Sequence, residues 1–365
     1  MVRRATISVV ALEPAALSLT WLQDWLGRCS AEIDIDLELT VGRALPDSAG
    51  AIMLLPRTRL ENGPIAASPI PRVWVDLADS RRPLQSTLPA REPVIRGRGI
   101  EGIRWAAQQL RGLLEWPPQV VPYGEHAEQF AVVREPRQGR PPYPAAALIH
   151  GGFWRERWTL DTIEPLAIDL ARRGFVTWNL EYRRVGPSGG GWPETQDDII
   201  AALNRLAQES RALVDLTRIV LIGHSAGAQL ALAASARPLA FVPRLIVSLA
   251  GVLDLALCAE RGLGDMGNAV VDFLGMFPDA PNETYAQASP IELAPIQTRQ
   301  LVAQGLADSP DLVEINRRYV EKCRAVHAQP VDFLETGGDH FTLIDPASAD
   351  WRTIISRITA AVEGS

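Results

Sequence analysis

Short apolar runs alternate with amphipathic segments from residue 124 onward. Each run is apolar on both of its alternating faces and is shorter than a typical helix, as expected of strands buried on both sides of a sheet. The segments between the runs repeat apolar positions every three or four residues, which is typical of helices. We therefore expect an α/β fold with a doubly wound, mostly parallel sheet. The predicted strands are 129–135, 145–150, 175–182, 218–225, 244–252, 299–306 and 330–337, and the predicted helices are 160–174, 195–210, 226–236, 313–328 and 350–363.

Residues 1–117 repeat this alternation on a smaller scale and predict a separate, small α/β accessory domain of unknown role. The stretch "PPQVVPY", residues 117–123, marks the boundary, and the second domain is expected to span 121–365. A further Pro/Gly cluster, "EPRQGRPPYP" at 135–144, is interpreted as a hairpin loop between two strands. In the first domain the predicted strands are 6–12, 33–41, 51–56 and 72–78, and the predicted helices are 15–29 and 100–116.

The stretch "VLIGHSAGAQLAL", residues 220–232, places a serine where a predicted strand meets a predicted helix. Gly223 and Gly227 flank Ser225 in a G-x-S-x-G pattern, which permits a sharp turn that lifts the serine hydroxyl clear of the sheet. The alternative is a serine that only caps the helix, as is common at helix starts. The strand before the turn and the helix after it favour a nucleophile.

A serine nucleophile needs a base, and His340 is the histidine best placed to serve. It lies in "GGDHFTLID", directly after the last predicted strand, and so at the carboxyl edge of the sheet with Ser225. Of the other histidines, His126 falls in the connector and His327 at the end of a helix. His224 is inside the turn, and we expect its side chain to point away from Ser225.

The acid that orients this base is expected between the serine and the histidine. The segment "GLADSPDLVEINRRY" offers Asp308, which comes first after a predicted strand, and Asp311, which precedes a helix. A carboxylate at a helix start is often explained by the free N–H groups there. We therefore favour Asp308 and keep Asp311 as the alternative.

Acyl transfer also requires N–H donors for an oxyanion, and "HGGFW" at 150–154 follows a predicted strand at the same edge. Gly151 lets the backbone approach a substrate closely. The expected donors are the N–H groups of Gly152 and Phe153, together with that of Ala226 after the nucleophile. His150 is expected to pin the loop by hydrogen bonds. The alternative is a plain glycine turn.

Composition narrows the class of protein. Apolar residues make up 47% of the 365, which suffices for a large core, and the net charge of −7 argues against nucleic acid as a partner. No apolar run is long enough to span a membrane, so no membrane contact is expected. Three widely spaced cysteines and no ligand-spaced cluster favour a reduced, cytoplasmic protein without metal or other cofactor. A homo-oligomer is compatible with these numbers.

Taken together, "HGGFW", "GHSAGA", "GLADSPDLVEINRRY" and "GGDHF" resemble the α/β-hydrolase superfamily in order and spacing, from about residue 121 to the end. They look closest to the esterase/lipase branch that includes kynurenine formamidase (arylformamidase) and peptidase-like carboxylesterases. The resemblance implies a serine hydrolase of small carboxylic esters, with an arylformamidase or other amidase as the alternative. A binding protein that kept the fold is a more distant one. Phe153 departs from the pattern, because it stands where that branch has a third glycine.

The segment 256–295 separates two predicted strands and lacks clean periodicity. We expect it to form part of a cap over the site, although ordinary core helices are an equal alternative. A large ring at Phe153, followed by Trp154, would crowd the acyl side and favour short acyl chains, formyl to butyryl. The candidate pocket walls are Leu255, Met266, Phe273 and Met276.

Overall fold

The computed structural model describes residues 6–11, 18–33, 35–42, 51–55, 70–75, 77, 93–95, 99–209, 212–278, 282–326 and 330–364. Its backbone contacts divide the chain into two compact units, Met1–Pro117 and Pro118–Ser365. Each unit is built around its own sheet, so each is described by itself.

The first unit has a five-stranded sheet in the order β2-β1-β3-β4-β5, with every neighbouring pair parallel. The strands β1 and β4 are buried on both faces, because successive residues such as Val9 and Val10 are both inaccessible to solvent, whereas the edge strand β2 is only partly buried. The predicted second strand and first helix begin a few residues later than expected. The elements are β1 (Thr6–Ala11), α1 (Leu19–Ile33), β2 (Asp36–Val41), β3 (Ile52–Leu55), β4 (Arg72–Val75), β5 (Val94–Ile95) and α2 (Glu101–Glu115).

The second unit has an eight-stranded sheet in the order β13-β12-β11-β10-β8-β9-β7-β6. The six strands from β13 to β9 are mutually parallel, and only β7 runs in the opposite direction, so that it pairs antiparallel with both β9 and the edge strand β6. The predicted doubly wound, mostly parallel sheet is confirmed. The strands are β6 (Gln119–Pro122), β7 (Phe130–Arg134), β8 (Tyr143–Ile149), β9 (Val176–Leu180), β10 (Val214–His224), β11 (Leu245–Leu249), β12 (Gln300–Gly305) and β13 (Val331–Thr336).

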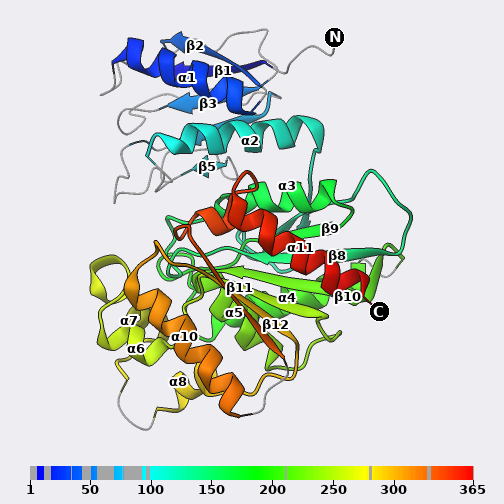
Figure 1. The fold of residues 1–365 in the computed structure, drawn as a ribbon, viewed down its shortest axis with the longest axis vertical. Coiled ribbons are helices and arrows are strands. Elements are labelled where there is room, and N and C mark those ends of the chain that lie inside the picture. Colours follow the sequence, from blue (N-terminus) through cyan, green and yellow to red (C-terminus); the bar gives the residue numbers. More distant parts are fainter. Residues whose placement is uncertain are drawn as a thin grey trace. The chain divides into compact units, whose positions relative to one another are not determined.

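Helices cover both faces of this sheet (Figure 1). On one face lie α3 and α11, which are joined by a hydrogen bond from Trp351 Nε1 to Asp169 Oδ2 of 2.8 Å; α4, α5 and α10 lie on the other. Short helices occupy the segment between β11 and β12. The helices are α3 (Glu164–Arg172), α4 (Glu194–Glu209), α5 (Ala226–Ser235), α6 (Leu255–Glu260), α7 (Ala269–Leu274), α8 (Glu283–Ala288), α9 (Pro290–Leu293), α10 (Pro310–Ala325) and α11 (Ala349–Glu363).

The proline-rich stretch 117–123 includes the division between the two units, which lies between Pro117 and Pro118. It also contains the edge strand β6, where a proline is tolerated because the outer side of an edge strand needs no N–H donor. One local prediction is wrong in the second unit. Residues 135–144 are not a hairpin loop. They connect β7 to β8, but β9 lies between these two strands and pairs with both of them.

Candidate active site

Ser225 occupies a strained turn between β10, which ends at His224, and α5, which begins at Ala226. Its backbone has φ 55° and ψ −119°, a left-handed conformation that a non-glycine residue rarely adopts. The Ser225 N–H donates to the carbonyl of Leu249 at 2.8 Å. Its side chain accepts no hydrogen bond from the N–H groups of α5, so helix capping does not explain the serine.

The two flanking glycines are required by close backbone contacts. A Cβ at Gly223 would overlap the first turn of α5, and a Cβ at Gly227 would overlap the carbonyl oxygen of Ile149 at the end of β8. The turn can therefore be this tight only because both positions lack a side chain.

Asp308 and His340 follow the ends of the adjacent strands β12 and β13 and contact each other. Oδ2 of Asp308 lies 2.7 Å from Nδ1 of His340. The carboxylate also accepts from the N–H of Ser309 at 2.7 Å and from Nε2 of Gln304 at 3.1 Å. These contacts orient the imidazole through one of its two nitrogens and leave Nε2 for another partner.

The surroundings of Asp308 favour the ionised carboxylate. Its side chain is only 6% exposed, and burial by itself opposes ionisation. The hydrogen bond and charge of His340 and the donors Ser309 and Gln304 outweigh that effect, so the pKa of Asp308 lies below its usual value. A carboxylate that stays charged can stabilise a positive imidazole beside it.

Asp311, the alternative acid, lies elsewhere. It belongs to the first turn of α10, its side chain is 38% exposed, and it pairs with Arg261 at 2.6 Å. The observed contact with His340 thus belongs to Asp308. His327 lies outside the described residues.

The loop after β8 lies against the serine turn. A Cβ at Gly151 would be 2.8 Å from Cβ of Ser225, and Gly152, with φ 114°, has no room for a side chain beside Trp158. Phe153 is also left-handed, with φ 49°. The structure therefore brings the predicted oxyanion loop next to Ser225, with Ala226 at the start of α5 beside it.

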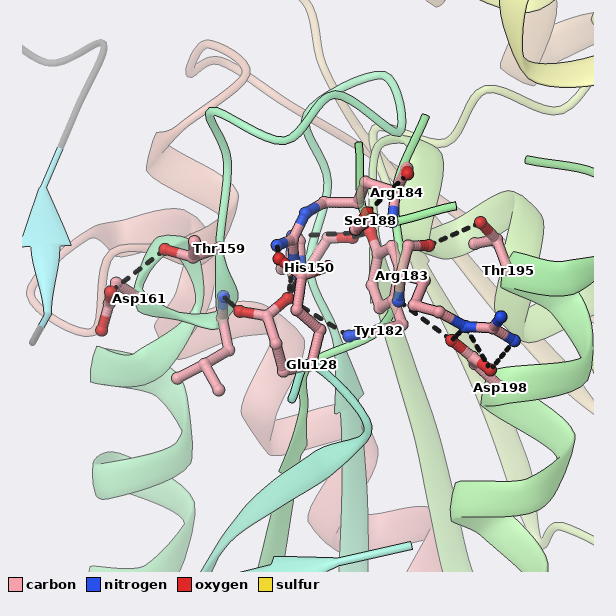
Figure 2. A network of polar contacts seen from close by, with 12 residues as sticks. Glu128, His150, Thr159, Asp161, Tyr182, Arg183, Arg184, Ser188, Thr195 and Asp198 are labelled. Atoms are coloured by element: carbon pink, nitrogen blue, oxygen red, sulfur yellow. Dashed lines mark hydrogen bonds and ion pairs between the residues drawn. The ribbon is translucent and has the colours of Figure 1, made fainter. Parts of the chain in front are cut away.

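His150 is fully buried at the base of this loop and bridges two segments of the chain (Figure 2). Its Nδ1 lies 2.8 Å from the carbonyl oxygen of Gly151, and its Nε2 lies 3.0 Å from Oε1 of Glu181. The hydroxyl of Tyr182 donates to the His150 carbonyl at 2.7 Å, and the two rings stack with centroids 4.3 Å apart. Burial, followed by the charge of Arg184, lowers the pKa of His150 to about 3.

The carboxylate of Glu181 anchors this support from the end of β9. It accepts from the N–H groups of Leu160 at 3.1 Å and Tyr182 at 3.2 Å, and it pairs with the buried guanidinium of Arg184. Arg184 in turn pairs with Glu128 at 2.5 Å. Because a buried charge is stable only when it is paired, this network holds the loop in one arrangement.

The cap prediction is partly wrong. Leu255 and Phe273 are buried in the core, where Phe273 stacks on Trp154 with centroids 4.2 Å apart, so these residues pack as ordinary helices do. Met266 is 90% exposed and Met276 is 42% exposed, so neither lines an enclosed pocket. Trp154 is also turned into the core and adds no bulk to the acyl side.

The segment between β11 and β12 does contact the loop after β8, but through Gly264, which is not one of the predicted pocket walls. The ring of Phe153 packs on Gly264, where a Cβ would lie 3.0 Å from the ring. Arg155 extends the contact by pairing with Asp272 at 2.7 Å and donating to Asn268 at 3.1 Å. The segment between β11 and β12 thus packs against the predicted oxyanion loop, residues 150–154.

Sequence reasoning did not identify three polar residues at this edge: Gln304, Glu181 and His224. Gln304 lies near the carboxyl end of β12 and Glu181 directly follows β9, a position that could have marked both residues. The His224 ring lies against His340, with its Nε2 3.0 Å from the His340 carbonyl oxygen. Its partner is distant in sequence, so no local pattern could reveal the contact.

In the described parts of the chain, the His, Cys, Asp and Glu side chains form no group of three that could hold a metal ion. No helix there is long and apolar enough to cross a bilayer.

Comparisons with known proteins agree on the fold. A family model described as BD-FAE matches residues 133–317, which include Ser225 and Asp308. Esterase B from Lactobacillus rhamnosis has 16% identity and a TM-score of 0.59, over 72% of this chain and 93% of its own. A bacterial heroin esterase has 22% identity and a TM-score of 0.55, over 68% and 84%.

A third solved structure is similar, carboxyl esterase 2 from Tuber melanosporum. It has 19% identity and a TM-score of 0.53, over 68% of this chain and 87% of its own. No curated protein matches the chain.

Proposed function

The chain belongs to the BD-FAE family, a domain of the α/β-hydrolase type, and from that premise we propose that it is a serine hydrolase that cleaves small carboxylic esters. In this proposal Ser225 is the nucleophile, His340 the general base and acid, and Asp308 the residue that orients His340. The N–H groups of Gly152, Phe153 and Ala226 stabilise the oxyanion.

The first half-reaction transfers the acyl group to the enzyme. The hydroxyl proton of Ser225 passes to Nε2 of His340 while Oγ forms a bond to the acyl carbon, and the carbonyl oxygen becomes an oxyanion. The bond between the acyl carbon and the alcohol oxygen then breaks. The departing oxygen takes the proton from His340, which restores the neutral imidazole and leaves an acyl-enzyme.

The second half-reaction repeats these steps with water. His340 accepts a proton from water while the water oxygen attacks the acyl carbon. The bond between the acyl carbon and Oγ of Ser225 then breaks, and Oγ takes the proton from His340. Each N–H donor to the oxyanion lowers the activation barrier by about 3 kcal/mol. The charge of Asp308 stabilises the imidazolium that forms in both steps.

One observation carries the proposal. The 2.7 Å contact between Asp308 and His340 lies at the same sheet edge as the strained turn of Ser225, and it engages Nδ1, so that Nε2 is the nitrogen left for the serine. A protein that used this fold only to bind ligands would not need a buried carboxylate paired with a histidine. The names of similar solved structures, which are called esterases, support the choice of esters over other acyl compounds as substrates.

Steady-state hydrolysis of p-nitrophenyl esters and of an aryl formamide by the wild type and Ser225→Ala tests the proposal. We expect ester turnover by the wild type and a loss of kcat of about 10⁶-fold in the variant, because removal of the nucleophile leaves only binding and oxyanion effects. A variant that keeps more than a few per cent of the activity would contradict the assignment. If the formamide reacts faster than every ester, the same machinery serves an arylformamidase.

A further inference from the structure

His224, the residue directly before Ser225, contacts both His340 and the loop at Gly151. It is the last residue of β10 and is buried. Its Nε2 lies 3.0 Å from the carbonyl oxygen of His340, and the two imidazole rings have centroids 4.6 Å apart. On its other side, a Cβ at Gly151 would lie 2.7 Å from the His224 carbonyl oxygen and 3.1 Å from its Nδ1.

The chemistry of this contact fixes the direction of the hydrogen bond. A backbone carbonyl oxygen only accepts, so Nε2 of His224 must carry the hydrogen that it donates to His340. The bond therefore holds the main chain of the base, whereas Asp308 holds its side chain at Nδ1. His340 is fixed from two directions, one of which originates in the strand that carries the nucleophile.

The base loop, residues 337–341, is also joined to the acid loop, residues 306–309. The N–H of Ala307 donates to the carbonyl of Gly338 at 2.9 Å, so this bond, like the pair of Asp308 with His340, joins the base loop to the acid loop. The strands β10 and β13 are separated in the sheet by β11 and β12. The register between the base loop and the serine turn is thus set directly through the His224 ring.

We propose that His224 is a positioning residue that keeps His340 in register with Ser225 through its Nε2–H. The proposal rests on the proposed function of these two residues. Because proton transfer requires close alignment of donor and acceptor, a shift of the base loop by about 1 Å lowers the rate by about 10²-fold without greatly altering substrate affinity.

The substitutions His224→Gln and His224→Asn separate this role from simple packing. The amide nitrogen of glutamine lies as many bonds from Cβ as Nε2 of histidine, whereas that of asparagine corresponds to Nδ1. Glutamine can therefore still donate to the His340 carbonyl, and asparagine cannot reach it. Both side chains are polar and smaller than the imidazole, so both disturb the packing.

We expect His224→Gln to keep kcat within about fivefold of the wild type and His224→Asn to lose about 30- to 100-fold, with KM within about threefold in both. The rate of phosphonylation of Ser225 by a fluorophosphonate should fall in the same order. A glutamine variant that loses as much as the asparagine variant, or an asparagine variant with wild-type kcat, would overturn the proposal.

Tyr319→Phe is the matched control for a loss of stability. It removes a buried hydrogen bond from Tyr319 Oη to Oε1 of Gln300, at the opposite end of β12 from Asp308. We expect a lower Tm with unchanged kcat. If kcat in the full set of variants simply follows Tm, the role of His224 is structural and the proposal is wrong. Failure of the wild type itself to react with the fluorophosphonate would instead refute the proposed function.

Discussion

The two units of this chain are each built on a sheet of mainly parallel strands, and among the described residues the candidate catalytic groups lie at one edge of the second sheet. In both sheets inner strands such as β4 and β11 are buried on both faces. Beyond its strands, the second unit contains strained backbone. Among the described residues, left-handed non-glycine conformations occur only in the second unit, at Phe153, Trp154, Ser225, Ala250 and Met266.

Ser225 and Ala250 directly follow β10 and β11, and Phe153 and Trp154 lie in the loop after β8. Met266 lies in the segment that packs on Phe153 through Gly264. Backbone strain persists only where the surrounding structure enforces it, and it concentrates at functional sites. The candidate catalytic side chains thus lie at the carboxyl edge of the parallel sheet, and the strained turns there set their orientation. For the first unit we keep the proposal of an accessory role without a catalytic part.

Asp308 and Asp311 are close in sequence but differ in their surroundings, so they test the proposed role of the acid. Asp308→Asn should lower kcat by about 10²- to 10⁴-fold, because the imidazole loses the charge that orients and stabilises it. Asp311→Asn should change kcat by less than about threefold, because that side chain lies on the surface and pairs with Arg261. Steady-state kinetics on p-nitrophenyl butyrate compares the two variants. Reversed results would move the acid to Asp311.

The oxyanion loop supplies the next test, through the ring of Phe153. We expect kcat/KM on p-nitrophenyl esters to peak at about four acyl carbons or fewer and to fall at least about tenfold by ten carbons. A methylene that must displace packed side chains costs about 1 to 3 kcal/mol, which exceeds its gain of about 0.8 kcal/mol. Phe153→Gly should move the peak to longer chains.

Met276→Ala serves as the control for this series, because Met276 is exposed and lines no enclosed pocket. It should leave the chain-length profile unchanged. Rates that rise up to decanoate in the wild type would contradict the assigned role of Phe153.

The smallest effect is expected from removal of the first unit. A truncated protein that begins at Pro118 should retain the wild-type kcat within about threefold, because the proposed catalytic residues all belong to the compact unit Pro118–Ser365. Circular dichroism establishes that the truncated protein is folded, and ester kinetics gives the comparison. A folded truncated protein with a hundredfold lower kcat would assign part of the chemistry to the first unit.

Most of the fold of the second unit follows from the sequence, because strand and helix periods differ clearly in buried elements. The sequence does not reveal which strands become neighbours. Strands β7 and β8 are consecutive in the chain, but β9 comes between them in the sheet, so the hairpin prediction for 135–144 fails. The strand β6 was not recognised because Pro117 and Pro118 precede it and Pro122 ends it; a proline is tolerated in β6 because the strand lies at an edge.

The site is predictable where its signals are local. The turn of Ser225, the loop from His150 to Phe153 and the loops of Asp308 and His340 all follow predicted strands, as the structure has them. The supports of these residues are not local, because the hydrogen bond from His224 to His340 joins residues 116 positions apart. Met266 misled as a pocket wall because its left-handed backbone turns an apolar side chain toward solvent, against the usual preference.

We propose that the strained turn at Ser225 presents an activated nucleophile. The decisive measurement is intact-mass spectrometry after treatment with a fluorophosphonate, followed by peptide mapping. We expect one adduct per chain, located on Ser225, absent from Ser225→Ala and slower to form in Asp308→Asn. An unmodified wild-type protein, or an adduct on another residue that persists in Ser225→Ala, would contradict it.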